Sequence, residues 1–284
     1  MSQPLPTDHR AVPTRAWDSK QAVHDFWDAA SCGEVYAEGE SLAQQYETHA
    51  RARYALEPYI RTFARFEEGA GRDVLEIGVG MGADHLQWSG ANPRSLTGVD
   101  LTPRAVEHTR RRLAFAGRHS NLEVADGERL PFPDDSFDIV YSWGVLHHSP
   151  NTARAVGEVR RVLRPGGVAR VMIYHTHSLV GDMLWLRYAL LAGRPRRPMA
   201  DVYAHHLESP GTKTYTVEEA RALFKDFRHV DARSALSFGD LLEGAVGQRH
   251  GGPLLTLAKR VWPRWLFRRL VPRRGLMLLV DAVK

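Results

Sequence analysis

From about residue 73 onward, short runs rich in β-branched residues alternate with helical stretches, and no internal repeat or glycine/serine linker interrupts this order. Such an alternation is typical of a parallel sheet covered by helices on both faces. Ligands of these sheets bind beyond the carboxyl ends of the strands, so residues that follow a strand are the first candidates for a site. The expected strands are residues 73–78, 95–101, 121–127, 136–144 and 168–175, followed by two closing strands at 229–238 and 275–284.

Short-range signals mark the helix boundaries. Thr102 is expected to cap a helix that starts with Pro103. Pro165 to Gly167 are expected to end the helix that starts near residue 152. Thr216 and Glu219 form a capping box for a later helix.

Composition sets the class of protein. The chain has 284 residues, of which 43% are hydrophobic, and this suits one α/β domain with accessory segments. The first residues lack the apolar core of a secretory signal. The single cysteine, Cys32, excludes an internal disulfide and suits a reducing cytosol. Since no window of 18 apolar residues occurs, we expect a soluble, cytoplasmic protein without a membrane span.

The stretch VLEIGVGMGAD, which starts in the first expected strand, permits two interpretations. Gly78, Gly80 and Gly82 form G-x-G-x-G, but Ala83 also completes the G-x-G-x-x-A pattern of dinucleotide-binding proteins. Both interpretations need a loop whose backbone can approach the bound ligand closely. Glu76 separates the two, because a carboxylate repels a nearby pyrophosphate and attracts a sulfonium or an ammonium.

Two more carboxylates follow neighbouring strands. Asp100 ends the second strand, where its paired oxygens can accept from both hydroxyls of a ribose, although a dinucleotide needs the same group. Asp126 follows the third strand, where it can accept from an exocyclic amine such as adenine N6. Together with Glu76, these acids favour a ligand that carries a positive charge and a nucleoside.

Four segments, VLEIGVGMG, GVDLT, ADGERLPFPDDSFDIVYSWGVLHHSPN and EVRRVLRPGG, resemble the class I S-adenosylmethionine-dependent methyltransferases, in particular the branch of ubiquinone and menaquinone biosynthesis methyltransferases. The resemblance covers about residues 70–175, and the combination is far more specific than the glycine loop alone. It implies a Rossmann-like, doubly wound sheet of seven strands with an antiparallel last strand. It also implies S-adenosylmethionine as the cofactor.

The resemblance implies roles for individual residues. The glycine loop would wrap the methionine part of the cofactor, and Trp143 would lie near that part. Asp100 and Leu101 would meet the ribose and adenine, whereas Asp126 with Gly127 would bind the adenine edge. The cofactor-binding residues expected altogether are Glu76, Gly78, Gly80, Gly82, Asp100, Leu101, Asp126, Gly127 and Trp143.

Five segments are expected along the chain. They are a flexible arm (1–17), an N-terminal helical lid (18–67), the cofactor-binding core (68–177), an inserted cap (178–215) and the C-terminal part of the core (216–284), with a basic, aromatic insertion at 250–274. Segments beyond the carboxyl ends of the strands tend to become lids, so the lid and the cap are both candidates for covering a substrate.

Methyl transfer from a sulfonium is an in-line displacement, so a base is needed only when the nucleophile must lose a proton. His147 and His148 follow the fourth strand, and either is a candidate base or hydrogen-bond partner of the substrate. Packing under the following helix is the alternative for this pair. Tyr174, His175 and Tyr203 are candidates for the substrate pocket, with core positions as the alternative.

Four histidines, His175, His177, His205 and His206, invite a metal-site hypothesis. No carboxylate stands at a telling spacing, and direct methyl transfer needs no metal. We therefore expect no metal.

Residues 257–274 combine seven cations with aromatic and aliphatic side chains and contain no acid. A solvated face beside a core face is the simplest interpretation, and peripheral contact with an anionic membrane is the alternative. Pro263 is expected to divide this stretch into two short helical pieces. No nucleic-acid partner is expected, because no aromatic-basic motif of a known reader accompanies the charge.

The leading hypothesis is a methyltransferase that acts on an oxygen, nitrogen or activated carbon atom of a small molecule such as a natural product. The alternatives are a methyltransferase of a lipid or prenylated quinone at a membrane surface, a nicotinamide-dependent oxidoreductase, and a non-catalytic scaffold that binds the cofactor. The acceptor, the use of a general base and the oligomeric state are left open by the sequence.

Overall fold

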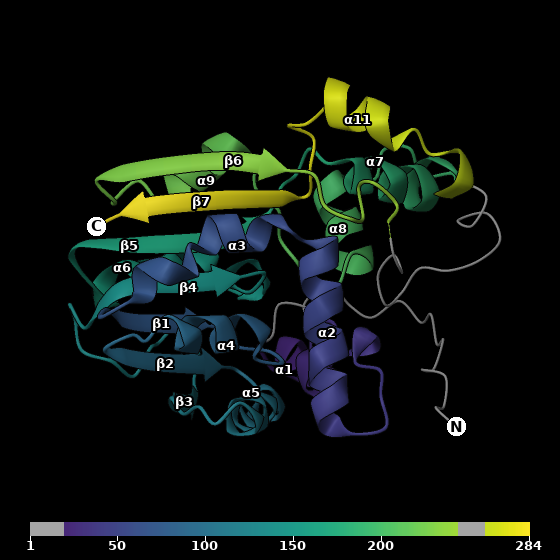
Figure 1. Ribbon diagram of the computed structural model, residues 1–284. Helices are drawn as coiled ribbons and strands as arrows, with labels where there is room; N and C mark the ends of the chain where they lie inside the picture. Colours follow the sequence, from purple (N-terminus) through teal and green to yellow (C-terminus); the bar gives the residue numbers. More distant parts are fainter. Residues whose placement is uncertain (1–19, 244–258) are drawn as a thin grey trace.

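The computed structural model describes residues 20–243 and 259–284, so the expected arm and the first part of the basic insertion lie outside the described residues. One sheet of seven strands has the order β3-β2-β1-β4-β5-β7-β6 (Figure 1). β7 is antiparallel to both of its neighbours, β5 and β6, which confirms the expected Rossmann-like, doubly wound sheet. The strands are β1 (Asp73–Ile77), β2 (Ser95–Asp100), β3 (Asn121–Val124), β4 (Phe137–Trp143), β5 (Leu163–Tyr174), β6 (His229–Ala235) and β7 (Met277–Val283).

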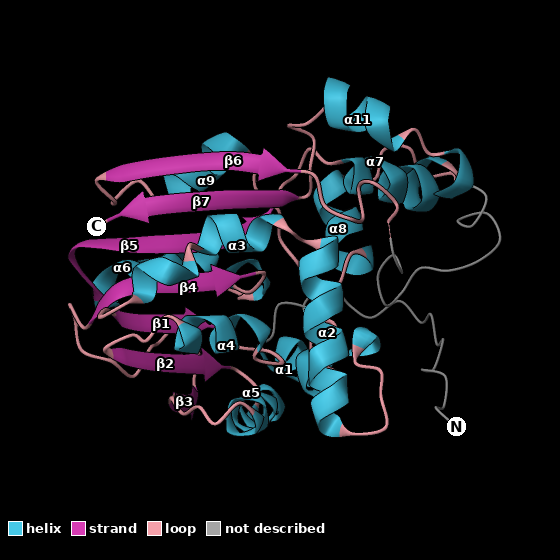
Figure 2. Ribbon diagram, viewed as in Figure 1, coloured by secondary structure: helices cyan, strands magenta, loops and turns pink. Residues whose placement is uncertain are grey.

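Helices cover both faces of the sheet (Figure 2). On one face, Phe63 of α3 and Trp88 of α4 belong to a buried apolar cluster. On the other face, Val159 of α6 and Ala220 of α9 belong to a second cluster. Because both faces are covered, every residue of β1 is buried. The helices around the sheet are α3 (Tyr59–Ala64), α4 (Ala83–Gly90), α5 (Pro103–Phe115), α6 (Thr152–Val162) and α9 (Val217–Leu223), with the short turn η3 (Phe66–Gly69) after α3.

Two expected helix caps are confirmed. The Thr102 side chain accepts from the Ala105 N–H, and Pro103 takes the first helical position of α5. Thr216 and Glu219 form the reciprocal hydrogen bonds of a capping box at the start of α9.

The helix expected to end before Pro165, Gly166 and Gly167 is α6, which ends at Val162. The stretch after it is not a loop, however, because β5 already begins at Leu163, which pairs with Phe137 of β4. Gly166 has a φ of 78°, and its N–H donates to the carbonyl of Lys284. Pairing with β4 and with the end of the chain therefore makes this stretch the irregular start of β5.

Two groups of helices cover the carboxyl ends of the strands (Figure 1). They fall within the segments 18–67 and 178–215 that the sequence marks as a lid and a cap. The first group is α1 (Lys20–Ala29), η2 (Glu34–Tyr36) and α2 (Leu42–Leu56), and the second is α7 (Leu179–Trp185), the π-helical turn η5 (Leu186–Leu190) and α8 (Met199–His206).

The basic stretch near the C-terminus contains the helix α11 (Arg264–Leu270). Pro263 separates it from helical residues at 259–261, so the expected break is confirmed. Across residues 20–243 and 259–284, no helix is both long and apolar enough to cross a bilayer.

The capping box at α9 provides a test of local stability. Thr216→Ala removes the acceptor of the Glu219 N–H and is expected to lower the free energy of unfolding by about 1 kcal/mol. Thr216→Ser keeps the hydroxyl and is expected to stay within about 0.5 kcal/mol of the natural protein. Urea titrations followed by circular dichroism measure both variants. Equal losses in the two would contradict a role for the cap.

Candidate functional site

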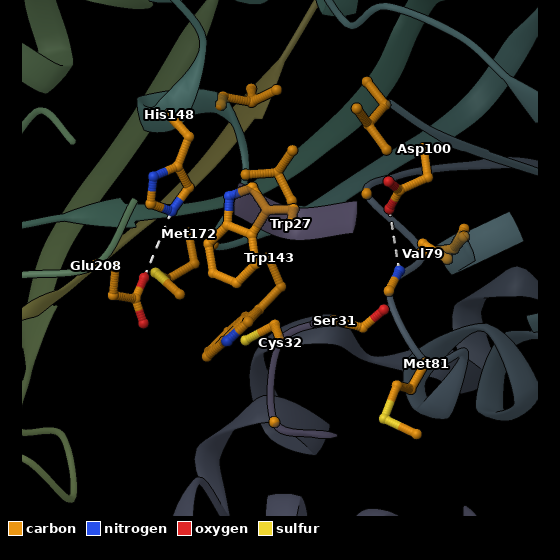
Figure 3. Close-up of a pocket in the computed structure, with 18 of the residues that line it drawn as sticks. Trp27, Ser31, Cys32, Val79, Met81, Asp100, Trp143, His148, Met172 and Glu208 are labelled. Atoms are coloured by element: carbon orange, nitrogen blue, oxygen red, sulfur yellow. Dashed lines mark hydrogen bonds and ion pairs between the residues drawn. The ribbon is translucent and has the colours of Figure 1, made fainter. Parts of the chain in front are cut away.

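A cavity of about 320 Å³ lies at the carboxyl ends of β1, β2 and β4 (Figure 3). The cavity is lined by the loops after these strands together with α1, α2 and the region around α7. We refer to the part around Gly78, Gly80 and Asp100 as the glycine side, and to the part around His148 and Glu208 as the histidine side. In Figure 3, Trp27 and Trp143 lie between the two sides.

The three glycines of the loop have different steric surroundings. Gly78 has a φ of 83°, and a Cβ on it would lie 2.1 Å from the Val145 side chain. Gly82 has a φ of 74°, and a Cβ on it would lie 2.9 Å from Thr109. A Cβ on Gly80 would meet no atom within 4 Å. Gly78 and Gly82 are therefore needed for packing within the chain, whereas Gly80 leaves open space in the cavity.

The Asp100 carboxylate is held in one orientation at the end of β2. Its Oδ1 accepts from the Thr102 N–H and hydroxyl, each at 3.0 Å, and its Oδ2 accepts from the Gly80 N–H at 3.1 Å (Figure 3). Burial raises the pKa of Asp100, while these hydrogen bonds oppose the rise. Asp100 and Leu101 both line the cavity, as the resemblance implies for the ribose end.

Asp126 and Gly127 also line the cavity. Asp126 Oδ1 accepts from the Glu128 N–H at 2.9 Å. The other oxygen of Asp126 forms an ion pair with Lys20 of α1, whose Nζ also lies 3.1 Å from Glu128 Oε2. These ion pairs hold the start of α1 next to the part of the cavity that is expected to bind adenine.

Glu76 is buried at the end of β1 and lines the cavity. His85 Nδ1 lies 2.9 Å from Glu76 Oε2, and His85 Nε2 lies 2.8 Å from the Ser120 hydroxyl. Burial raises the pKa of Glu76 well above its usual range and lowers the pKa of His85 to about 3. A cation that enters the glycine side would favour the ionised form of Glu76, consistent with the ligand charge predicted from the sequence.

A second buried carboxylate, Asp84, joins α2 to the core. It accepts from Arg53 Nε at 3.0 Å and from Arg53 Nη2 at 2.6 Å. The hydroxyls of Tyr54 and Tyr141 donate to it at 2.9 and 2.7 Å. Arg53 and Asp84 line the cavity, yet the sequence prediction missed both. The acid in the first turn of α4 was the available signal, but its cationic partner stands on a distant helix.

Glu57 and Trp143 lie where the two sides of the cavity meet. The Trp143 ring packs against Tyr59 and Phe63, each with a centroid distance of 5.9 Å. Burial raises the pKa of Glu57 to about 7, and the Arg53 guanidinium opposes this rise. The site therefore contains a carboxyl group that titrates near neutral pH.

The histidine side is organised around His148 and Glu208. His148 Nε2 lies 3.5 Å from Glu208 Oε2, which also accepts from the Tyr174 hydroxyl at 2.6 Å (Figure 3). His148 Nδ1 lies 2.8 Å from the Ser209 hydroxyl and 3.1 Å from the Thr212 hydroxyl. The cap segment thus supplies the hydrogen-bond partners of Nδ1, whereas Nε2 faces the Glu208 carboxylate without a hydrogen-bond partner among the described residues.

Three predicted substrate-side residues do not line the cavity. His147 is fully buried between the rings of His148 and Tyr174, with both centroid distances at 4.1 Å, and burial lowers its pKa well below the usual range. His175 Nδ1 donates to the Gly275 carbonyl at 3.1 Å, and the Tyr203 hydroxyl donates to a backbone carbonyl at 2.9 Å. Throughout residues 20–243 and 259–284, no three His, Cys, Asp or Glu side chains gather in an arrangement suited to a metal.

Several cavity residues came from segments that carried no strand-end signal. They contact the cavity because helices fold over the sheet, which local sequence patterns do not specify. The lining residues missed in this way are Lys20, Cys32, Arg53, Glu57 and Glu208. Asp84, directly after the glycine loop, and Met172, within β5, were missed although they lie on expected elements.

Residues 75–171 match a methyltransferase domain. The 27-O-demethylrifamycin SV methyltransferase of Amycolatopsis mediterranei (strain S699) is 37% identical over 100 residues, which cover 34% of this chain and 37% of that protein. The phthiotriol/phenolphthiotriol dimycocerosates methyltransferase 1 of Mycobacterium ulcerans (strain Agy99) is 40% identical over 144 residues, or 50% of each chain. The chain therefore spans half or less of the length of these curated relatives.

The fold is similar to that of an S-adenosylmethionine dependent methyltransferase from Mesorhizobium loti, with a TM-score of 0.51 and 19% sequence identity. This likeness covers 80% of the present chain and 97% of the other. The methyltransferase-domain match runs from β1 into β5, so it contains the glycine loop, Asp100, Asp126 and His148.

The reactivity of the Cys32 thiol provides a test of the environment inside the cavity. Cys32 is exposed and lines the cavity, where desolvation by the surrounding residues raises the pKa of its thiol to about 12. Because the thiolate is the reactive form, DTNB at pH 8 is expected to label native Cys32 more than about 100-fold more slowly than the unfolded protein. Labelling in guanidinium chloride is the control and should be fast. Equal rates in the two states would contradict the raised pKa of the Cys32 thiol.

Proposed function

We propose that this protein transfers a methyl group from S-adenosylmethionine to a small molecule. One observation carries the proposal: Glu76, Asp100 and Asp126 meet around an open glycine loop in one cavity, inside the region that matches a methyltransferase domain. A cytoplasmic location, favoured by the single cysteine, is part of the proposal.

The lining of the glycine side suits this cofactor. Asp100 Oδ2 accepts one hydrogen bond, from Gly80, and keeps a lone pair for a ribose hydroxyl. Asp100 and Leu101 would hold the ribose and adenine. Asp126, together with Gly127, would bind the adenine edge and accept a hydrogen bond from the adenine amine. The Asp126 oxygen that pairs with Lys20 would then serve both Lys20 and the adenine amine. When bound, the cofactor supplies a methyl group attached to a positively charged sulfur.

The methionine part of the cofactor would lie among Glu76, Gly80 and Trp143. With the sulfonium or ammonium bound, Glu76 would ionise and supply a negative charge in a buried position, where charge attraction is weakly screened. Gly80 leaves the open space that a close approach of the ligand requires.

Apolar side chains dominate the lining of the histidine side. Such a lining excludes water and favours an acceptor that is mostly apolar. The polar groups of Tyr174, His148 and Glu208 are gathered at one place. We therefore infer an apolar acceptor with one polar group directed at His148. The apolar lining residues include Trp27, Met172, Val180, Leu207, Phe238 and Leu276.

His148 is the proposed general base, and a hydroxyl oxygen is the proposed acceptor atom. With its proton on Nδ1, donated to the Ser209 hydroxyl, His148 can take the acceptor proton on Nε2. Glu208, 3.5 Å from Nε2, would stabilise the imidazolium that results. Tyr174 donates to Glu208 and keeps that carboxylate in place.

A lipid or a prenylated quinone is the second candidate acceptor. The apolar lining of the cavity favours this candidate. The resemblance of the sequence to the ubiquinone and menaquinone biosynthesis methyltransferases favours it as well. A natural product similar to 27-O-demethylrifamycin SV is favoured instead by the similarity to the methyltransferase named for that compound.

The decisive experiment is incubation of the protein with methyl-labelled S-adenosylmethionine and a cell extract, followed by mass spectrometry. We expect label in a small, mostly apolar molecule. Tight binding of the cofactor without any labelled product would favour the non-catalytic scaffold. Calorimetric binding of NAD without binding of S-adenosylmethionine would favour the oxidoreductase.

Asp100→Asn tests the cofactor assignment. The variant loses a charged acceptor, so the Kd for S-adenosylmethionine is expected to rise at least about tenfold in calorimetry. The matched variant Asp226→Asn changes an exposed residue outside the cavity and should bind normally. Equal affinities for the Asp100 variant and the natural protein would remove Asp100 from the cofactor site.

His148→Gln tests the base. Its kcat is expected to fall by about 10²- to 10⁴-fold while the cofactor Kd stays unchanged. Asp100→Asn should show the opposite pattern: its affinity for the cofactor falls, while His148 can still act as the base. A parallel loss of cofactor affinity in His148→Gln would point to a rearranged cavity and contradict the assignment.

A further inference from the structure

Two neighbouring segments carry most of the exposed large hydrophobic side chains in the described part of the chain. Of nine such residues, six lie within 183–200 and 259–280, and Leu191 and Trp265 are each 71% exposed. Single exposed apolar residues are ordinary, but a concentration of this kind marks an interaction surface. We refer to these two segments as the basic apolar face. Its six exposed apolar residues are Leu186, Leu190, Leu191, Val261, Trp265 and Leu270.

Hydrogen bonds connect the second segment to the start of α7, the helix that leads into the first segment. Arg274 Nη2 donates to Asp182 Oδ1 of α7 at 3.1 Å. Trp262 Nε1 donates to the Asp240 carbonyl at 3.0 Å, and the Asp240 side chain accepts from the Val180 N–H at 3.0 Å. The start of α7 is therefore tied to both ends of the stretch that contains α11, and Figure 1 shows these helices together beyond the carboxyl ends of the strands.

The same segments concentrate positive charge. Residues 183–200 contain four arginines, residues 259–280 contain seven cations, and neither segment contains an acid. The formal net charge of the whole chain is +5, so the eleven cations of this face leave a net −6 for all other residues. Three of the cations, Arg197, Arg268 and Arg274, pair with acids that border the face. An excess of positive charge remains after these pairs are counted.

The basic apolar face is continuous with the wall of the cavity. Val180, near the start of α7, lines the histidine side. The helix continues through η5 to Leu190, a run of 12 residues that spans about 18 Å. A surface that contacts Leu190 and Leu191 would therefore lie one short helix away from the cavity.

We propose that the basic apolar face docks on an anionic lipid bilayer. Arginines near the headgroups supply electrostatic attraction, while Trp265 and the exposed leucines enter the interfacial region. Exposed aliphatic side chains among the cations favour a membrane over a nucleic acid, which offers them no apolar layer. Docking is independent of methyl transfer, whereas delivery of an apolar acceptor from the bilayer rests on the proposed function.

Co-sedimentation of the full chain with lipid vesicles tests the proposal. We expect partitioning onto an equal mixture of phosphatidylcholine and phosphatidylglycerol at about 0.1 M salt, and much less at about 0.5 M, where charges are more strongly screened. Vesicles of phosphatidylcholine alone should bind weakly. Failure of the natural protein to bind the anionic vesicles would overturn the proposal. The assay contains neither cofactor nor acceptor, so it is independent of the methyl-labelling result.

Matched variants locate the contact. Arg269→Glu/Arg273→Glu is expected to reduce partitioning at least about tenfold. Arg72→Glu/Arg228→Glu has the same charge change on exposed residues at the opposite end of the sheet and should stay within about twofold. An equal loss in both charge variants would overturn the assignment to this face.

Leu191→Ser/Trp265→Ser tests the apolar contribution, because both side chains are exposed and their removal should leave the fold intact. We expect at least about a tenfold loss of partitioning, with an unchanged circular dichroism spectrum. Val124→Ser, at the exposed edge strand β3, is the matched control and should bind normally. If partitioning depended on the charges but not on Leu191 and Trp265, the face would be a binding surface for a polyanion such as a nucleic acid. That outcome would overturn the membrane assignment.

Discussion

The buried carboxylate of Asp84 joins the helical cover to the sheet. Its side chain is 2% exposed and its partner Arg53 is 19% exposed, so the ion pair is largely removed from water. Such a pair is stable only when the remaining hydrogen-bonding sites are also satisfied, and Tyr54 and Tyr141 supply the further donors. Because Asp84 lies directly beyond the glycine loop, the ion pair fixes α2 above that loop and brings Glu57 to the cavity.

The enclosure that follows determines the electrostatics of the site. Burial raises the pKa of Glu76, Glu57 and the Cys32 thiol, so each resists carrying an uncompensated negative charge. A positively charged ligand relieves this cost on the glycine side. The histidine side is apolar apart from its polar cluster, and therefore suits the acceptor. One cavity thus combines an environment for a cationic donor with a water-poor environment for an apolar acceptor.

The cap contributes to both the cavity and the surface. Its residues Glu208 and Ser209 flank the two ring nitrogens of His148, and its helix leads from the cavity wall to the basic apolar face. The proposed substrate site and the proposed membrane contact therefore both depend on one segment. Arg274 connects this segment directly to the C-terminal stretch, and Trp262 does so through Asp240. The cationic charge near the end of the chain is therefore positioned by the same packing.

Local patterns in the sequence determined the strands, two helix caps, the conformation of the glycine loop and the strand-end acids Asp100 and Asp126. Each of these depends on residues a few positions apart, and strand ends of a parallel sheet meet at one edge whatever covers them. Only the tertiary structure decided that Pro165 to Gly167 enter a strand, that His147 is buried while His148 reaches the cavity, and that Glu208 lies beside it. The Arg53 to Asp84 contact joins residues 31 positions apart, and the His148 to Ser209 contact joins residues 61 apart. Such contacts arise from the packing of separate elements, which periodicity and capping signals do not encode.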